Sequence, residues 1–334
     1  MSKSILVLTL YVIITLSIPF LVFSLRTGQP RHSDSCNRPP ADLRTLQTDQ
    51  MTVLINGYSD HRIPLLHSIA ATYAAASSVA AVIILWSNPS TPSQILSDLS
   101  KNLSLSTSSS STPITILRQP SSSLNLRFYP HPSITTRSVL ICDDDIEPDT
   151  NSINFAFNIW KSNPDRLIGF FVRSHNYDLT HKSWIYTMET QKYSIMLTKF
   201  MILNLRYLHQ YTCNKEYEKL KVIVDEKNNC EDILMNFVVA EEVNKGPILV
   251  GAKKVRDWGD ARNEGEGMKE REVGLSSRKG EHRKRRGECI GEFHGLLGKM
   301  PLKYSYGKVM DAIGEQGLCD KGGKLVYCDK QIFR

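Results

Sequence analysis

Apolar runs of strand length alternate with a helical pattern in the first half of the chain, and this alternation restricts the fold more than any other feature. Residues 51–56 (MTVLIN) are a strand-like run, residues 64–69 place apolar side chains at helical spacing, and residues 79–86 (VAAVIILW) are a second strand-like run. Strand, helix and strand in this order make up the unit of a parallel α/β sheet. Two further runs, residues 114–117 and 139–142 (VLIC), extend the predicted sheet.

Three aspartates, Asp143, Asp144 and Asp145, directly follow the run at 139–142. In open α/β sheets, ligands bind at the carboxyl ends of the strands. Adjacent carboxylates repel one another, and at the end of a buried strand a cation compensates that repulsion. Oxygen ligands favour Mg²⁺ or Mn²⁺, which takes one or two carboxylates and completes its shell with substrate phosphates. The triplet therefore predicts a metal-diphosphate site, and the alternative is an aspartate-rich surface turn.

The second half of the chain continues the α/β pattern. Residues 155–160 (FAFNIW) have helical spacing, residues 167–172 (LIGFFV) are strand-like, and a buried helix is predicted from Asp232. Asp232 is either the N-cap of that helix or a functional carboxylate. Residues 257–286 are polar, glycine-containing and highly charged, so we predict a mobile loop over the site.

An uncharged segment, residues 5–24 (ILVLTLYVIITLSIPFLVFS), stands near the amino terminus. A bilayer core requires about 20 such residues, so we predict a transmembrane signal anchor. A cleaved signal peptide is the alternative, although no small-x-small cleavage site follows before Arg26. The predicted organisation is a short tail at 1–4, the anchor at 5–24, a stem at 25–50 and one folded domain at 51–334.

Two features favour a lumenal placement of that domain. The chain contains the glycosylation sequon Asn102-Leu103-Ser104 and seven cysteines, an odd number that leaves at least one thiol unpaired. The net charge is +7, and most of the excess lies in residues 278–286 (RKGEHRKRR). That run is typical of a solvated surface, and in the lumen an anionic ligand such as a nucleotide diphosphate or a phospholipid headgroup is expected rather than a nucleic acid.

Several longer motifs, in chain order, resemble glycosyltransferase family 64: LWSNPSTP, SLNLRF, LICDDD, FAFNIWKSNPDRLIGFFVR, NCEDILMNF, GLSSRKGEHRKRRGECI and MPLKYSYG. The resemblance covers the chain from Met51 to the carboxyl terminus. The family includes the hexosaminyltransferase domain of animal exostosin-like proteins and a set of plant enzymes. The segments INGYSDHRIPLL, RDWGDARNE and GEQGLCDKGGKLVYCD resemble those of plant members that add mannose to glycosylinositol phosphorylceramide sphingolipids. The resemblance implies a GT-A glycosyltransferase fold, which combines a nucleotide-sugar-binding half with an acceptor half.

The resemblance also implies roles for individual residues. Asp143, Asp144 and Asp145 match the DxD motif, with Asp145 as the metal ligand and the other two in contact with the ribose and sugar of the donor. Three further positions match donor-binding residues of the family: Arg62, Asn88 and Arg127. Arg127 stands sixteen residues before Asp143, which is the family spacing.

A second group of matched residues lies in the other half of the chain. Asp232 matches the carboxylate beneath the reacting sugar, and Arg286 matches the arginine that meets the donor diphosphate. Without the resemblance, Arg286 would be assigned to the solvated basic run. Cys230 and Cys289 match a family disulfide that would hold Asp232 and Arg286 near each other.

These matches predict a retaining mannosyltransferase that uses Mn²⁺ or Mg²⁺, GDP-mannose and a glycolipid acceptor. It would be a single-pass type II protein of the Golgi membrane with a lumenal catalytic domain. Where animal members have an asparagine five positions before Arg127, this chain has Ser122, which is compatible with a guanine donor. Two alternatives stay open: a UDP-N-acetylglucosaminyl- or glucosaminyltransferase, and a catalytically silent, anchored carbohydrate-binding protein.

Overall fold

A computed structural model describes most of the chain beyond the amino-terminal region: residue 36 and residues 44–106, 111–189, 191–260, 279–311 and 318–327. The chain divides into two compact units, Met1–Pro39 and Pro40–Arg334, and every element below belongs to the second. The predicted anchor at 5–24 and most of the predicted stem lie outside the described residues. Within the described ranges, no helix is both long enough and apolar enough to cross a membrane.

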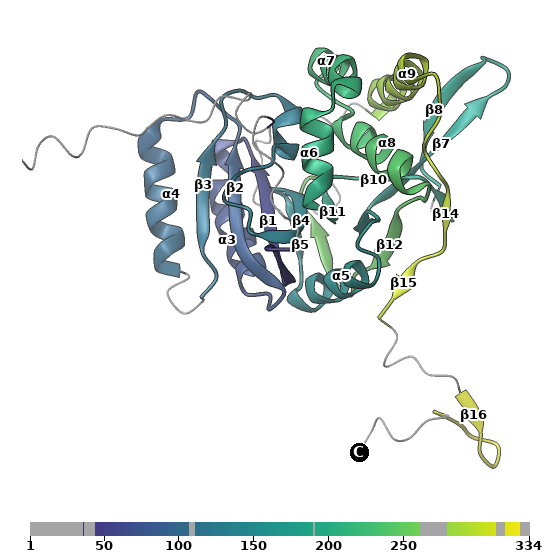
Figure 1. Ribbon diagram of the computed structural model, residues 1–334. Coiled ribbons are helices and arrows are strands. Elements are labelled where there is room, and N and C mark those ends of the chain that lie inside the picture. Colours follow the sequence, from purple (N-terminus) through teal and green to yellow (C-terminus); the bar gives the residue numbers. More distant parts are fainter. Residues whose placement is uncertain are drawn as a thin grey trace, which may run out of the picture. The chain divides into compact units, whose positions relative to one another are not determined.

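An eight-stranded sheet forms the centre of the second unit (Figure 1). Its strands lie side by side in the order β15 (Val309–Met310), β12 (Ile248–Gly251), β6 (Ile168–Gly169), β11 (Phe200–Asn204), β4 (Thr136–Asp143), β1 (Gln47–Gly57), β2 (Val79–Trp86) and β3 (Ile114–Arg118). All neighbours are parallel except β11, which is antiparallel to both β4 and β6. The predicted α/β architecture is therefore confirmed, and the predicted parallel sheet is parallel except at β11.

Helices cover both faces of this sheet. Side chains alternate between the two faces of each strand, so each face contributes apolar residues to a core cluster of its own. From β1, Met51, Val53 and Ile55 belong to one core cluster, whereas Leu54 belongs to the other. The first cluster contains residues of α3 (Ile63–Ala74), α4 (Ser93–Ser106) and α5 (Thr150–Ser162). The second contains residues of α6 (Leu205–Cys213), α7 (Glu218–Lys227), α8 (Glu231–Val243) and α9 (Lys279–Leu297).

Within the described ranges, short strands form four smaller sheets. They are β7 (Val172–Asp178) with β8 (Ser183–Thr187) and β10 (Ile195–Met196), β5 (Ile146–Pro148) with β13 (Val255–Asp257), β9 (Lys192–Tyr193) with β14 (Ser305–Tyr306), and β16 (Leu318–Asp320) with β17 (Leu325–Tyr327). In the part of the chain that the structure describes, three 3-10 helices connect longer elements: η1 (Asp60–Arg62), η2 (Leu124–Phe128) and η3 (Lys215–Tyr217). The pairing of β5 with β13 brings residues 255–257 next to the segment that follows the aspartate triplet.

Two predictions from sequence are wrong in detail. Residues 167–172 are not one strand: β6 ends at Gly169, where a Cβ atom would lie 2.1 Å from the carbonyl oxygen of Phe200, and β7 begins at Val172 in another sheet. Residues 279–286 are not loop but the first half of α9. That helix buries Cys289, Ile290 and Phe293 against the second core cluster, so tertiary packing decides its conformation rather than its polar composition.

Candidate active site

The aspartate triplet lies at the carboxyl end of β4, beside the end of β1. Asp143 is the last residue of β4 and lies opposite Asn56 of β1. Arg62, from η1, reaches the next two carboxylates: its Nη1 atom lies 2.8 Å from Asp144 Oδ1 and 3.1 Å from Asp145 Oδ2. One guanidinium thus faces two carboxylates with side-chain exposures of 6% and 13%, which leaves negative charge in excess.

Asp145 has the properties expected of a metal ligand. Burial, reinforced by the charges of Asp143 and Asp144, raises the pKa of Asp145 to about 7, against the opposing charges of Arg62 and Lys199. Its Oδ1 atom is buried and has no hydrogen-bond partner among the described residues. An ionised carboxylate in such a place favours a cation, and Mn²⁺ or Mg²⁺ fits an oxygen ligand of this kind.

The protein supplies few further ligands at this point. Within the part of the chain that the structure describes, no group of three or more His, Cys, Asp or Glu side chains is arranged to hold a metal. An ion held by one or two carboxylates completes its coordination with water and ligand phosphates. The donor set around Asp145 therefore fits a metal that arrives with a diphosphate.

The segment 255–260 fixes Asp145 from the other side. The backbone N–H of Trp258 donates to the Asp145 carbonyl oxygen at 2.8 Å, and the indole N–H of Trp258 donates to Glu147 at 2.8 Å. Lys199 forms an ion pair with Asp257. At Gly259 a Cβ atom would lie 2.3 Å from Asp145 Oδ2, so only glycine allows this approach. Neither Lys199 nor Gly259 was singled out from the sequence.

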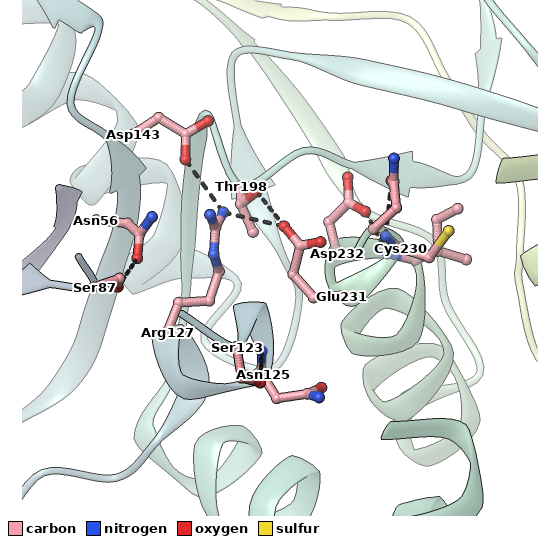
Figure 2. A network of polar contacts seen from close by, with 12 residues as sticks. Asn56, Ser87, Ser123, Asn125, Arg127, Asp143, Thr198, Cys230, Glu231 and Asp232 are labelled. Atoms are coloured by element: carbon pink, nitrogen blue, oxygen red, sulfur yellow. Dashed lines mark hydrogen bonds and ion pairs between the residues drawn. The ribbon is translucent and has the colours of Figure 1, made fainter. Parts of the chain in front are cut away.

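Arg127 connects the triplet to the second half of the chain (Figure 2). It lies in η2 and is buried, and its Nη1 atom is 3.2 Å from both Asp143 Oδ1 and Glu231 Oε1. Thr198 donates a further hydrogen bond to Glu231 at 3.4 Å. Glu231 was missed from sequence, although a carboxylate that directly precedes Asp232 at the start of an apolar helix is a signal that could have identified it.

Asp232 and Arg286 form a buried ion pair. Asp232 stands in the first turn of α8 and Arg286 in α9, and the distance from Arg286 Nη2 to Asp232 Oδ2 is 2.6 Å. Their side chains are 4% and 6% exposed, so the predicted solvated alternative for Arg286 is wrong. Arg286 also donates to Asn229 Oδ1 at 3.0 Å, and its Cζ atom lies 4.5 Å from the centre of the Tyr186 ring. Burial alone would lower the pKa of Arg286, but Asp232 and Tyr186 raise it on balance.

A disulfide between Cys230 and Cys289 joins the two helices that carry this pair. The cysteines are 59 residues apart in sequence, and their Cα atoms are 6.4 Å apart. Cys230 immediately precedes α8, and Cys289 lies one turn beyond Arg286. The bridge therefore fixes the start of α8 against the buried side of α9.

The matched residue Asn88 and the sequon residue Asn102 lie outside this network. Asn88 follows β2, is half-buried, and accepts a hydrogen bond from the Ser90 backbone at 2.9 Å. Asn102 has an exposed side chain in α4 and takes no part in the site. At the ends of β1 and β2, Ser87 donates to Asn56 at 3.2 Å, a contact not anticipated from sequence (Figure 2).

Comparison with known proteins agrees with these motifs. A model of the Glycosyl transferase family 64 domain matches residues 51–314. The chain is 57% identical over 306 residues to glycosyltransferase family protein 64 C3 of Arabidopsis thaliana, which covers 91% of this chain and 92% of that protein. The chain belongs to glycosyltransferase family 64. The resemblance seen in the sequence motifs is thereby confirmed, and this membership supports a glycosyltransferase that takes a nucleotide-sugar donor and an acceptor.

Relatives outside plants match a shorter part of the chain. Exostosin-1c of Danio rerio is 34% identical over 239 residues, or 67% of this chain and 28% of that protein, and Exostosin-1 of Bos taurus is 35% identical over 201 residues. The family 64 chain thus spans about a quarter of the length of the exostosins it matches. Among solved structures, GalNAc-T7 with UDP, GalNAc and Mn²⁺ aligns at a TM-score of 0.40 and 10% identity over 60% of this chain and 41% of that one, which is too distant to support any further statement.

Proposed function

We propose that this family 64 protein is a metal-dependent, retaining glycosyltransferase of GT-A fold that transfers mannose from GDP-mannose to the glycan headgroup of glycosylinositol phosphorylceramide. The observation that carries the proposal is a pair of linked ion pairs. One set runs from Asp143 through the buried Arg127 to Glu231, and the next residue, Asp232, forms a buried pair with Arg286. Motifs from three distant parts of the sequence therefore meet in one site.

Within this site, Asp145 would hold Mn²⁺ or Mg²⁺, and the bound ion would offset negative charge on the donor diphosphate. Asp143 and Asp144 stand at the same strand end, where they can contact the ribose and sugar of the donor. Arg62, already paired with two of these carboxylates, adds positive charge beside the diphosphate, and Asn88 and Arg127 are the remaining donor-binding positions.

Arg286 and Asp232 would act on the reacting sugar. An arginine fork is always charged and suits a departing diphosphate, whose charge develops in the transition state. Arg286 pairs with Asp232 at 2.6 Å and so holds its carboxylate in a fixed position. From that position Asp232 can orient the acceptor hydroxyl or stabilise positive charge on the sugar.

The proposed setting is the Golgi membrane. Residues 5–24 would anchor a type II protein, residues 25–50 would form a stem, and residues 51–334 would form the lumenal catalytic domain. An anchor confines an enzyme and a lipid acceptor to the same surface. Asn102 would carry a glycan there, and its exposed side chain is compatible with that modification.

Donor turnover tests the proposal. The purified protein is assayed against GDP-mannose and UDP-N-acetylglucosamine, each with Mn²⁺ and with chelator, and Asp145→Asn serves as the matched variant. Chelator-sensitive turnover of GDP-mannose alone, lost in Asp145→Asn, is the expected result. Turnover of the UDP-sugar alone would identify a hexosaminyltransferase instead. No turnover of either donor would leave a carbohydrate-binding protein without activity.

A further inference from the structure

A cavity of about 660 Å³ opens between β8 and α9, two elements that run side by side (Figure 1). Its size lies within the range of ~300–1,000 Å³ that is usual for small-molecule sites. Tyr186 lines the cavity, and the same ring stacks on Arg286, the partner of Asp232. The cavity therefore adjoins the buried ion pair of the proposed reaction centre.

Glycines of α9 explain why this space exists. At Gly287 a Cβ atom would lie 2.9 Å from the carbonyl oxygen of Trp184, so helix and strand pack backbone against backbone. One turn later, at Gly291, a Cβ atom would meet no atom within 4 Å, and Gly291 lines the cavity. The helix is thus held close to β8 at one turn and leaves open space at the next.

Aromatic rings form one part of the cavity lining. Trp184 lies at the centre, with the ring of Tyr177 5.0 Å away and that of His294 5.5 Å away, both nearly perpendicular to the indole. The indole N–H donates to His294 Nδ1 at 3.1 Å, which fixes the orientation of the indole. Tyr177 is 46% exposed, so the ring cluster is accessible from solvent. Such rings offer flat, partly apolar surfaces together with polar edges.

Positive charge forms the other part of the lining. Lys182, Arg283 and Lys284 all line the cavity and are exposed. The one carboxylate among the lining residues, Glu288, has Lys227 as a partner at 3.5 Å. The cavity therefore combines aromatic surface with an excess of positive charge, and cations of this kind bind phosphate through charge-assisted hydrogen bonds.

We propose that this cavity binds a phosphorylated polyol ring, namely the inositol phosphate portion of the acceptor, and this inference rests on the proposed function. The flat faces of Trp184 and Tyr177 suit a six-membered ring, and the three cations suit its phosphate. With the phosphorylated ring held there, the glycan attached to it would lie on the Tyr186 side of the cavity, which faces Arg286 and its partner Asp232. The cavity thereby selects acceptors that carry negative charge.

Calorimetric titration of the full-length protein with myo-inositol 1-phosphate, inorganic phosphate and uncharged myo-inositol tests this inference. We expect the phosphorylated ring to bind about tenfold or more tightly than either of the other two. The double change Arg283→Gln and Lys284→Gln is expected to remove the preference for the phosphorylated ring over myo-inositol.

Two glycine variants separate cavity filling from effects on the helix. Gly291→Leu fills the cavity and is expected to weaken binding of myo-inositol 1-phosphate by about tenfold or more. Gly295→Leu is the matched control, because a Cβ atom at Gly295 also meets no atom within 4 Å and Gly295 does not line the cavity. It is expected to bind like the wild-type protein. Thermal unfolding of both variants verifies that each is folded.

Equal losses in the two leucine variants, or equally tight binding of inorganic phosphate, would overturn the inference. Donor hydrolysis in the same preparation distinguishes this failure from failure of the proposed function. Turnover of GDP-mannose without binding of myo-inositol 1-phosphate would refute the cavity assignment and leave the proposed function intact. Binding of myo-inositol 1-phosphate without turnover of any nucleotide sugar would refute the proposed function, and with it the assignment of this ligand as part of an acceptor. The cavity would still be a binding site for the phosphorylated ring.

Discussion

Removal of one charge from the buried Asp232–Arg286 pair is expected to destabilise the protein strongly. Asp232→Asn keeps the side-chain shape but leaves Arg286 buried without an ionised partner, since both side chains are at most 6% exposed. Breaking a buried ion pair in this way costs about 3–5 kcal/mol. In a domain of this size 1 kcal/mol lowers the midpoint of thermal unfolding by ~2–4 °C, so we expect a fall of roughly 6–20 °C.

The double variant Asp232→Asn with Arg286→Met tests the reason for that loss. It contains neither unpaired charge, and replacing both members of a buried pair is often close to neutral. We therefore expect the double variant to unfold at a higher temperature than either single variant, Asp232→Asn or Arg286→Met. It should have no transferase activity. Double-mutant cycles measure this coupling directly.

A surface pair provides the control. Lys299 and Glu216 are 3.7 Å apart and about half exposed, at 49% and 47%, so Glu216→Gln is expected to cost less than about 1 kcal/mol. Differential scanning calorimetry on all four variants is the assay. If Asp232→Asn costs no more than Glu216→Gln, or if the costs of the single variants simply add in the double variant, the two buried charges do not stabilise each other in this way.

Three further predictions follow from the same site. In metal-free protein, the pKa of Asp145 at about 7 lies above its unfolded value, so the free energy of unfolding should fall as pH rises from ~4 to ~7. Added Mn²⁺ should progressively restore that lost stability over the same pH window. In thermal-shift measurements, Asp145→Asn should abolish both the pH-dependent loss and its recovery with Mn²⁺. Gly259→Ala, which would bring a Cβ atom to within 2.3 Å of Asp145 Oδ2, should weaken Mn²⁺ binding roughly tenfold without altering the circular dichroism spectrum; unchanged affinity would contradict the assigned contact. Loss of the disulfide through Cys230→Ser with Cys289→Ser should lower the free energy of unfolding by about 4 kcal/mol, because the bridge closes a 59-residue separation, as measured by urea titration; a change below about 1 kcal/mol would argue against that account.

Local pattern was sufficient to predict the first half of the sheet. The run at 79–86 coincides with β2, and the runs at 51–56, 114–117 and 139–142 lie within β1, β3 and β4. Strands β1, β2 and β4 are largely buried, with helices on both faces, so their apolar residues are continuous and easily recognised. Strand β3 lies at the edge of the sheet and is only partly buried. The position of the aspartates at the end of β4 followed from the same pattern.

Tertiary contacts determined what the sequence pattern missed. Residues 279–286 are polar and carry many like charges, yet they begin a helix, because Arg286 finds Asp232 and the following turns pack on the core. Arg286 became a site candidate only through the resemblance to family 64. The position of Glu231 beside Asp232 was a local signal that could have identified it, but its pairing with Arg127, which is distant in sequence, could not be predicted from local pattern.

The division of the strand-like run at 167–172 has a similar cause. Nothing in the local sequence indicates that Gly169 must approach the backbone of Phe200 or that the chain then joins a second sheet. Residues 257–286 were predicted to lie over the site, but the contact of residues 258 and 259 with Asp145 was not. That contact accompanies the pairing of β13 with β5 and places Gly259 against Asp145.

Nucleotide binding tests most directly the claim that Asp145 and Arg286 belong to one metal-dependent donor site. GDP is titrated into the wild-type protein, Asp145→Asn and Arg286→Gln, each with Mn²⁺ and with chelator, and binding is measured by calorimetry. We predict that GDP binds the wild-type protein only with Mn²⁺, and that both variants lose at least about tenfold in affinity. Equal binding of GDP with Mn²⁺ and with chelator, or full affinity in either variant, would contradict the account.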